Sequence, residues 1–134
     1  MSQENPSEHI VQIYYEDTDF SGLVYHANYL KYFERAREHL LGPSELKRLY
    51  DEEGTGFVVY KVELTYREGA RFGDRLVIRS AVEMESAYRA LFHQDAHRET
   101  DDKLLVQGLL QLVCVGRDGN LVPLPPSVVR SIRR

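Results

Sequence analysis

The chain has 134 residues, with 17 Lys and Arg against 21 Asp and Glu, and a formal net charge of −4. This length accommodates one hydrophobic core, so we expect a single domain over residues 1–134. The acidic balance argues against nucleic acid as a partner, because a surface that follows phosphates needs an excess of Lys and Arg.

Cysteine usage and hydropathy bear on location. Cys114 is the only cysteine and has no partner for an internal disulfide, and residues 1–6 lack the basic and apolar regions of a secretory signal. The apolar runs are short, such as Phe57–Tyr60, whereas a membrane-spanning helix needs ~20 apolar residues. We therefore expect a cytoplasmic protein with no transmembrane segment.

The first half of the chain contains a strand pattern followed by a helix pattern. Residues 10–15 are rich in β-forming side chains, and apolar residues then recur at helical spacing from Tyr29 to Leu40. Gly42 and Pro43 end this pattern, which predicts one amphipathic helix. Glu34, Arg35 and Arg37 are expected to be surface charges of that helix. Ser44 can cap a brief second helix that extends to residue 50.

Alternation of apolar and polar residues dominates the second half. One predicted strand places alternate residues on a face that we expect to be buried: Val58, Tyr60, Val62, Leu64 and Tyr66. Further strands are predicted over residues 76–84, 88–96 and 104–114, where Cys114 shares the spacing of the core residues. The connections are too short for crossovers, so we expect antiparallel pairing. Periodicity thus predicts an antiparallel sheet that covers one helix.

The segment between the first strand and the helix carries the strongest motif. It reads Tyr-Glu-Asp-Thr-Asp at residues 15–19, then Gly22, then Val-Tyr-His-Ala-Asn-Tyr at 24–29. It places carboxylates just ahead of a helix N-terminus, where unpaired N–H groups and a partial positive charge suit a developing oxyanion. The pattern indicates chemistry at a carbonyl group, with a carboxylate as base or nucleophile.

This motif, together with Glu-Arg-Ala-Arg at residues 34–37, resembles the signature of hotdog-fold acyl-CoA thioesterases of the 4-hydroxybenzoyl-CoA thioesterase type. Within that group it is most similar to the Tol-Pal-associated acyl-CoA thioesterases. The turn at 73–74, the strand end at 113–115 and the tail at 122–125 match as well. The resemblance implies an α+β hotdog fold, in which an antiparallel five-stranded sheet wraps around one long helix. It also implies hydrolysis of an acyl-CoA thioester to a free carboxylic acid and CoA.

The resemblance assigns roles to particular residues. Asp19 is the implied catalytic carboxylate, which either attacks the thioester carbonyl or activates a water; the sequence leaves both routes open. His26 is the second catalytic residue, and we favour its backbone N–H over its imidazole as the group that polarises the carbonyl. Asp17 is expected to be structural. Substrate-binding side chains are expected at Val24, Tyr25 and Val59 for the acyl group and at Arg89 for the CoA phosphates.

Metal binding is the first alternative that we weighed. Residues 17–22 imitate the start of a calcium-binding EF-hand loop, but the twelfth position is Asn28 rather than a bidentate Glu. His93 and His97 lie in a predicted strand, where four residues span about 13 Å, which is too far for one shared metal. We therefore expect no metal and no redox cofactor.

Two other functions use the same fold. One is a noncatalytic hotdog protein that binds acyl-CoA or acyl-carrier protein, which has no need for a carboxylate such as Asp19 beside the thioester. The other is a dehydratase, which calls for a histidine paired with an acidic residue. Because the enzymes that this chain resembles build their sites between subunits, the resemblance also implies a homodimer or homotetramer.

Overall fold

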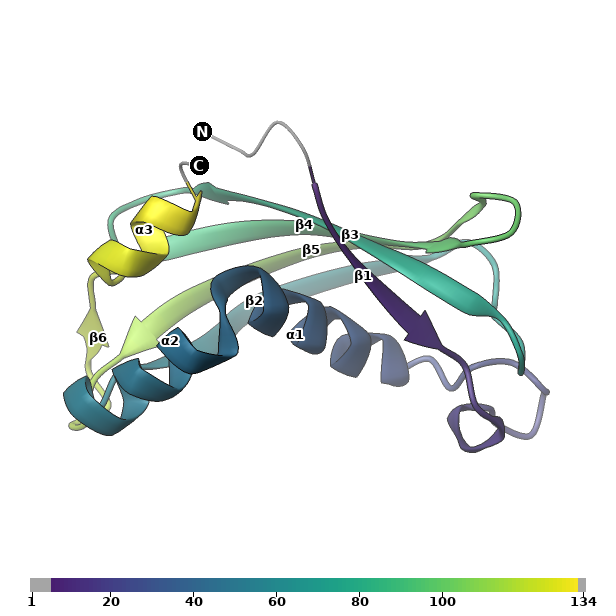
Figure 1. Cartoon of the computed structure of the whole chain (residues 1–134), viewed down its shortest axis with the longest axis horizontal. Coiled ribbons are helices and arrows are strands. Elements are labelled where there is room, and N and C mark those ends of the chain that lie inside the picture. Colours follow the sequence, from purple (N-terminus) through teal and green to yellow (C-terminus); the bar gives the residue numbers. More distant parts are fainter. Residues whose placement is uncertain (1–5, 133–134) are drawn as a thin grey trace.

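An antiparallel sheet packs on one side against a long helix, α1 (Asn28–Leu41), in the computed structural model of the protein, which describes residues 6–132 (Figure 1). The long strands lie in the order β1-β3-β4-β5-β2, and a short strand, β6, pairs with β5. Their bounds are Ser7–Gln12 (β1), Gly56–Tyr66 (β2), Arg75–Met84 (β3), Arg89–Arg98 (β4), Leu104–Val115 (β5) and Leu121–Val122 (β6). The long helix, the five long strands and the antiparallel pairing of neighbouring strands confirm the prediction, but the pairing of β2 with β3 that the short connection suggested is wrong, because β2 pairs with β5.

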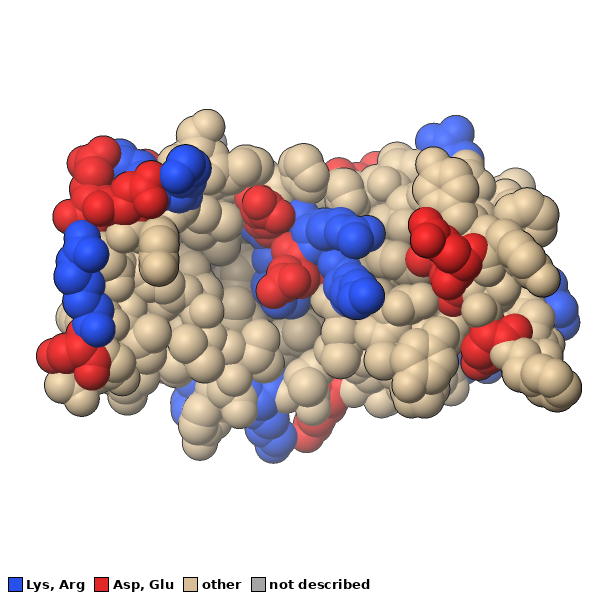
Figure 2. All heavy atoms as spheres, turned by 90° about the horizontal axis from the view of Figure 1, so that it is seen from below, with Lys and Arg blue, Asp and Glu red and all other residues tan. Residues whose placement is uncertain are grey.

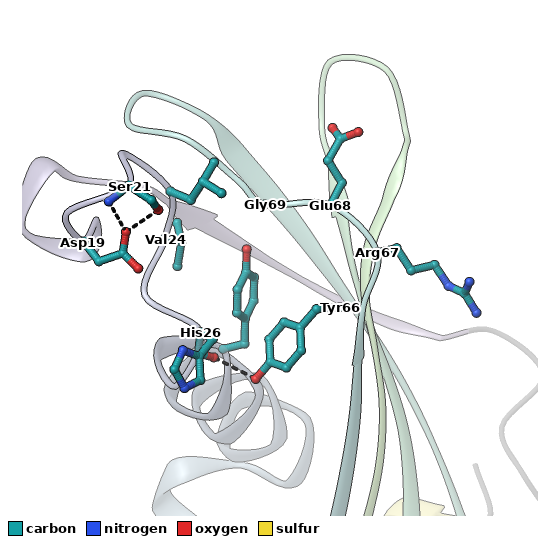
Figure 3. A pocket seen from close by; sticks show the side chains of 10 residues that line it. Asp19, Ser21, Val24, His26, Tyr66, Arg67, Glu68 and Gly69 are labelled. Carbon is teal, nitrogen blue, oxygen red and sulfur yellow. Dashed lines mark hydrogen bonds between the residues drawn. The ribbon is translucent and has the colours of Figure 1, made fainter.

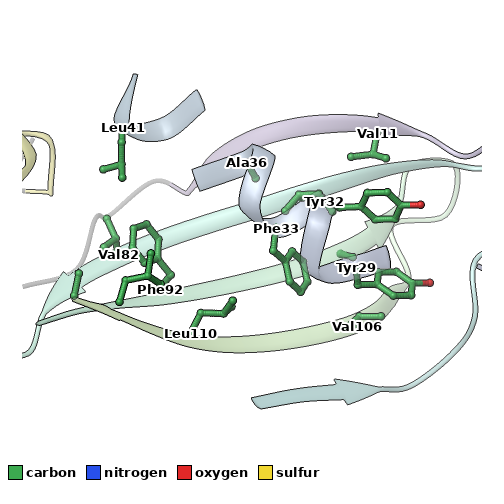
Figure 4. Close-up of a cluster of buried hydrophobic side chains, with 14 of the residues drawn as sticks. Val11, Tyr29, Tyr32, Phe33, Ala36, Leu41, Val82, Phe92, Val106 and Leu110 are labelled. Atoms are coloured by element: carbon green, nitrogen blue, oxygen red, sulfur yellow. The ribbon is translucent and has the colours of Figure 1, made fainter. Parts of the chain in front are cut away.

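Helix α1 forms where the apolar spacing predicts it, and its buried stripe faces the sheet. Figure 4 shows Tyr29 and Phe33 directed from α1 towards the strands that carry Phe92 and Leu110. The helix ends at Gly42, which has a φ of 99° and donates its N–H to the Glu38 carbonyl oxygen at 2.8 Å. Gly42 therefore caps α1, whose last helical residue is Leu41.

One residue of the helix differs from the predicted pattern of buried residues, and one glycine of the sheet explains how closely the helix packs. Arg37 was expected on the surface, but it belongs to the buried stripe of α1 and is only 6% exposed. Gly108 in β5 lies directly beneath the helix, where an added Cβ would be 3.1 Å from Cε2 of Phe33. The absence of a side chain at Gly108 therefore allows the helix and the sheet to approach closely.

The predicted burial of one face of β2 is wrong. A β-bulge between Val59 and Lys61 shifts the alternation, so that Val59 and Val62 share a face whereas Val58 turns to the other. Val62 is 39% exposed and Val59 45%, because β2 is an edge strand that α1 covers only in part. The chain thus leaves an apolar sheet edge uncovered.

Strands β2 and β3 are consecutive in the sequence but lie three strand spacings apart in the sheet. Eight residues, 67–74, connect them across the ends of β5 and β4, a distance of about 14 Å at ~4.8 Å per strand. Residues 67–74 are too few to form a helical crossover. They are still enough to span the ends of the two intervening strands and so join β2 to β3. Its first N–H groups, those of Arg67 and Glu68, donate to the Leu105 carbonyl oxygen.

Four short helical elements were not predicted or were predicted only in part. The second helix, α2 (Pro43–Arg48), continues into a π-helical turn, η2 (Leu49–Glu53). A short 3-10 turn, η1 (Tyr15–Asp17), precedes α1, and the C-terminal helix α3 (Pro126–Ile132) buries Val128 and Ile132. No helix within residues 6–132 combines the length and the apolar character needed to cross a bilayer.

Candidate active site

The loop between β1 and α1 is held in place by Asp17. Its carboxylate accepts hydrogen bonds from the Tyr14 N–H at 2.7 Å and from the Tyr32 hydroxyl at 2.8 Å. Its backbone carbonyl accepts from the Asn28 side chain at 3.0 Å. Because both carboxylate oxygens are occupied, Asp17 ties the loop to α1, which agrees with the structural role expected for it.

Asp19 lies at the tip of the same loop, in a tight turn. The Gly22 N–H donates to the Asp19 carbonyl oxygen at 3.0 Å, and Gly22 has a φ of 83°, which favours glycine at that position. Oδ1 of Asp19 accepts from the Ser21 hydroxyl at 2.5 Å and from the Ser21 N–H at 2.8 Å (Figure 3). These bonds, the hydroxyl first, lower the pKa of Asp19 below its ordinary value. Asp19 is therefore an exposed, oriented carboxylate that stays ionised.

His26 occupies the entry to α1. Its carbonyl oxygen accepts a hydrogen bond from the Tyr66 hydroxyl at 2.9 Å, and the two rings meet edge to face with centroids 6.2 Å apart. Its backbone N–H donates to no residue in the described range 6–132. Tyr66 of β2 thus fixes the first turn of the helix through the His26 carbonyl oxygen, while the His26 N–H remains available to a ligand.

Asp19 and His26 line one pocket of about 320 Å³, beside the first turn of α1 (Figure 3). The N–H of Val24, which is itself buried, donates to the Ala70 carbonyl oxygen at 2.9 Å and joins the loop to the β2–β3 connection. The remaining lining residues come from the loop, α1, β2 and that connection: Ser21, Leu23, Tyr29, Tyr66, Arg67, Glu68 and Gly69. The pocket therefore brings together a carboxylate, a helix N-terminus and two tyrosines.

Three other residues predicted in the site lie outside this pocket. Tyr25 packs its ring against His26, with centroids 4.7 Å apart. Val59 lines a separate cavity near the other end of α1, and Arg89 pairs with Glu85 at 3.1 Å and lies over the Tyr60 ring. Within one chain, only Val24 of the predicted substrate-binding residues adjoins Asp19.

Sequence reasoning missed Ser21 and Tyr66 as members of the site. A serine two residues after an aspartate is a common turn pattern and was the available signal for Ser21. Tyr66 was placed among the apolar residues of β2, although a tyrosine hydroxyl near buried backbone groups usually finds a partner. Cys114 is fully buried, and burial raises its pKa to about 12, so the prediction of a core residue is confirmed.

Comparison with known proteins gives one consistent result. Residues 14–132 match the thioesterase-like superfamily model. The acyl-CoA thioesterase YbgC of Haemophilus influenzae is 36% identical over 107 residues, which cover 78% of this chain and 77% of that protein. The YbgC protein of Helicobacter pylori strain 26695 is 38% identical over 84 residues, which cover 62% of each chain.

Solved structures agree at the level of the fold. A probable thioesterase from Bartonella henselae is 27% identical and superimposes with a TM-score of 0.82, covering 90% of this chain and 99% of that one. A 1,4-dihydroxy-2-naphthoyl-CoA thioesterase from Synechocystis gives a TM-score of 0.88 over 96% of both chains at 22% identity. The expected hotdog fold is thereby confirmed, and the chain belongs to the thioesterase-like superfamily.

Proposed function

We propose that the protein is an acyl-CoA thioesterase whose catalytic carboxylate is Asp19. The observation that carries the proposal is the position of Asp19: Ser21 anchors one oxygen, and the other accepts no hydrogen bond from residues 6–132. The carboxylate lines the pocket together with the N-terminal turn of α1. The superfamily match and the names of the YbgC relatives supply the reaction class.

The thioester carbonyl is proposed to lie between Asp19 and His26, with its oxygen on the His26 N–H. A donor at that point stabilises the negative charge that develops on the oxygen in the transition state. Asp19 then either attacks the carbonyl carbon or takes a proton from an attacking water. By either route water supplies the hydroxyl of the acid and the proton of the released CoA thiol.

The substrate is proposed to extend away from this point in two directions. Val24 supplies an apolar wall next to the reacting carbonyl, while Tyr25 and Val59 are proposed to contact the acyl group and Arg89 the CoA phosphates. Neither Val59 nor Arg89 lines the pocket of Asp19 within one chain, so these two roles require a second subunit or an extended substrate.

Release of free CoA from a panel of acyl-CoAs, followed with a thiol reagent, tests this function. Turnover that is first-order in enzyme supports the thioesterase. Tight acyl-CoA binding without thiol release would favour the alternative, a noncatalytic binder of acyl-CoA or acyl-carrier protein. The cytoplasmic location expected from cysteine usage stays a prediction.

The exposed edge of β2 supports the proposal of a homodimer or a larger homo-oligomer. This strand presents unpaired backbone groups and half-exposed valines, and a second copy pairing along it would cover both. In such a symmetric dimer the two β2 strands pair antiparallel, and the two-fold axis passes near the middle of β2. The end of β2 at Tyr66 then meets the end at Phe57 of the other copy.

We predict that Val62→Lys converts the oligomer to monomer, because it would place two charges face to face at the paired edges. Ile10→Lys is the matched control, since Ile10 is similarly exposed at 42% but lies on β1, at the opposite edge of the sheet. Sedimentation velocity distinguishes the two variants. Dissociation by Ile10→Lys alone would move the interface to β1.

The activity of the enzyme should fall at acidic pH only below the ordinary pKa of an aspartate. Asp19 acts as its ionised form, and its lowered pKa keeps that form populated to lower pH. Ser21→Ala removes the hydroxyl that contributes most to the shift, so the pKa should rise and the acidic limb of kcat/KM should move to higher pH. An unchanged acidic limb in this variant would separate the limb from Asp19.

A further inference from the structure

The cavity at the far end of α1 contains a buried cation that the reaction at Asp19 does not use. Figure 2 shows the face of the molecule that carries α1, where acidic and basic side chains gather beside a hollow. The cavity has a volume of about 210 Å³. Its apolar walls come from α1, α2, β2 and β5: Leu41, Leu46, Phe57, Val59 and Leu112. Arg37, Glu34 and Glu38 complete the lining.

Neutral groups hold Arg37 in place. Its Nη1 donates to Oε1 of Gln94 at 3.0 Å, and its guanidinium lies 5.9 Å from the centre of the Phe92 ring. The Gln94 amide is itself fixed, because its nitrogen donates to the Phe33 carbonyl oxygen and to the Ser80 hydroxyl, both at 2.9 Å. The guanidinium is therefore oriented before any ligand arrives.

Arg37 lacks a counter-ion in the described part of the chain. It is 6% exposed, yet among residues 6–132 no carboxylate oxygen lies within 4.0 Å of its nitrogens. Burial lowers its pKa, and Glu34 opposes that shift only through space. A guanidinium has five N–H groups, and the bond to Gln94 uses one. The other nitrogens of Arg37 are not among the buried polar atoms that lack a partner within residues 6–132, so they open onto the cavity, where an acceptor on a ligand can reach them.

The charges around the cavity favour an uncharged acceptor. Glu34 and Glu38 are exposed and line the same cavity as Arg37, so the lining carries two acidic groups and one basic group. A carboxylate on the ligand would add a third negative charge. A hydroxyl or keto oxygen accepts from Arg37 without doing so, while the apolar walls suit a hydrocarbon chain.

We propose that this cavity binds the distal end of the acyl group and that Arg37 selects acyl chains that carry a hydroxyl or keto oxygen there. The inference rests on the proposed thioesterase function. Within one chain, His26 and Arg37 are eleven helix positions apart, about 16 Å. In the proposed dimer, the β2 strands of two copies pair antiparallel. The Phe57 end of β2 in one copy then lies beside the Tyr66 end in the other. The Arg37 cavity of the first copy is thereby brought next to Asp19 of the second.

The test compares three CoA thioesters of equal chain length: a plain acyl chain, its ω-hydroxy analogue and its ω-carboxy analogue. We expect kcat/KM to be highest for the ω-hydroxy substrate, by about tenfold or more over the plain chain, since a charged donor strengthens a hydrogen bond to that extent. The difference should appear mainly in KM. A wild-type enzyme that prefers the plain or the ω-carboxy chain overturns the inference without any variant.

Arg37→Met tests the assignment to this residue, and thermal melting checks that the variant is folded, because it leaves Oε1 of the buried Gln94 without its donor. It should abolish the preference for the ω-hydroxy chain, whereas Arg35→Met, on the exposed side of α1, should retain it. Retention of the preference in Arg37→Met overturns the assignment. Failure of the wild-type protein to hydrolyse any acyl-CoA instead contradicts the proposed function, which keeps the two failures distinct.

Discussion

Asp19→Asn is expected to lower kcat for acyl-CoA hydrolysis by about three orders of magnitude or more, while the fold and the oligomer remain. The amide is neither a nucleophile nor a base, so both proposed routes through Asp19 are lost. Asparagine retains an oxygen that can accept from the Ser21 hydroxyl and N–H, so the turn at 19–22 should keep its shape. Thiol release under single-turnover conditions measures the loss, and sedimentation and thermal melting verify the assembly.

Glu16→Gln is the matched control for charge. It removes one negative charge from the same loop, but Glu16 is exposed and does not line the pocket. Its activity should stay close to that of the wild type. Near-normal turnover in Asp19→Asn would assign the catalytic role to another group, and an equal loss in both variants would indicate a general effect of loop charge.

The sequence was sufficient to predict those parts of the fold that depend on local periodicity. The stripe from Tyr29 to Leu40 predicted α1, and alternation predicted the long strands. Strand order was not predictable in this way. The short connection at residues 67–74 resembles a hairpin between β2 and β3, yet it spans the two strands that lie between them. The exposed face of β2 was missed for a similar reason: alternation indicates which residues share a face but not whether the same chain covers it.

The site was predictable only to the extent that one motif carries it. The motif brought Asp19, Val24 and His26 to a single pocket, and these three are close in sequence. Tyr66 joins them from a distant strand, so no local pattern predicted its bond to the His26 carbonyl oxygen. The burial of Arg37 was missed because it depends on Gln94 and Phe92 in β4, which stand far from it in sequence and supply a polar partner and an aromatic face.

Substitutions at His26 are expected to separate the backbone from the side chain. If the N–H polarises the carbonyl, His26→Ala retains the donor and should lose little activity, whereas His26→Pro removes it and should reduce kcat by about a hundredfold or more. The hydrogen bond from Tyr66 reaches the carbonyl oxygen of His26, which both variants keep. Circular dichroism and thermal melting are needed for both proteins, since proline also restricts the backbone of Tyr25.

The pattern of losses distinguishes the two roles. Equal and severe losses in two folded variants would assign the function to the imidazole, which His26→Ala removes and which packs between the rings of Tyr25 and Tyr66. Loss in His26→Pro alone would instead agree with a donor whose position is set by the helix entry, since the backbone N–H of His26 has no acceptor among residues 6–132. In that case the orientation of the first turn of α1, which Tyr66 helps to fix, determines how well the oxyanion is stabilised. Tyr66→Phe removes the hydroxyl that holds this turn, so it should lower kcat more than it changes KM.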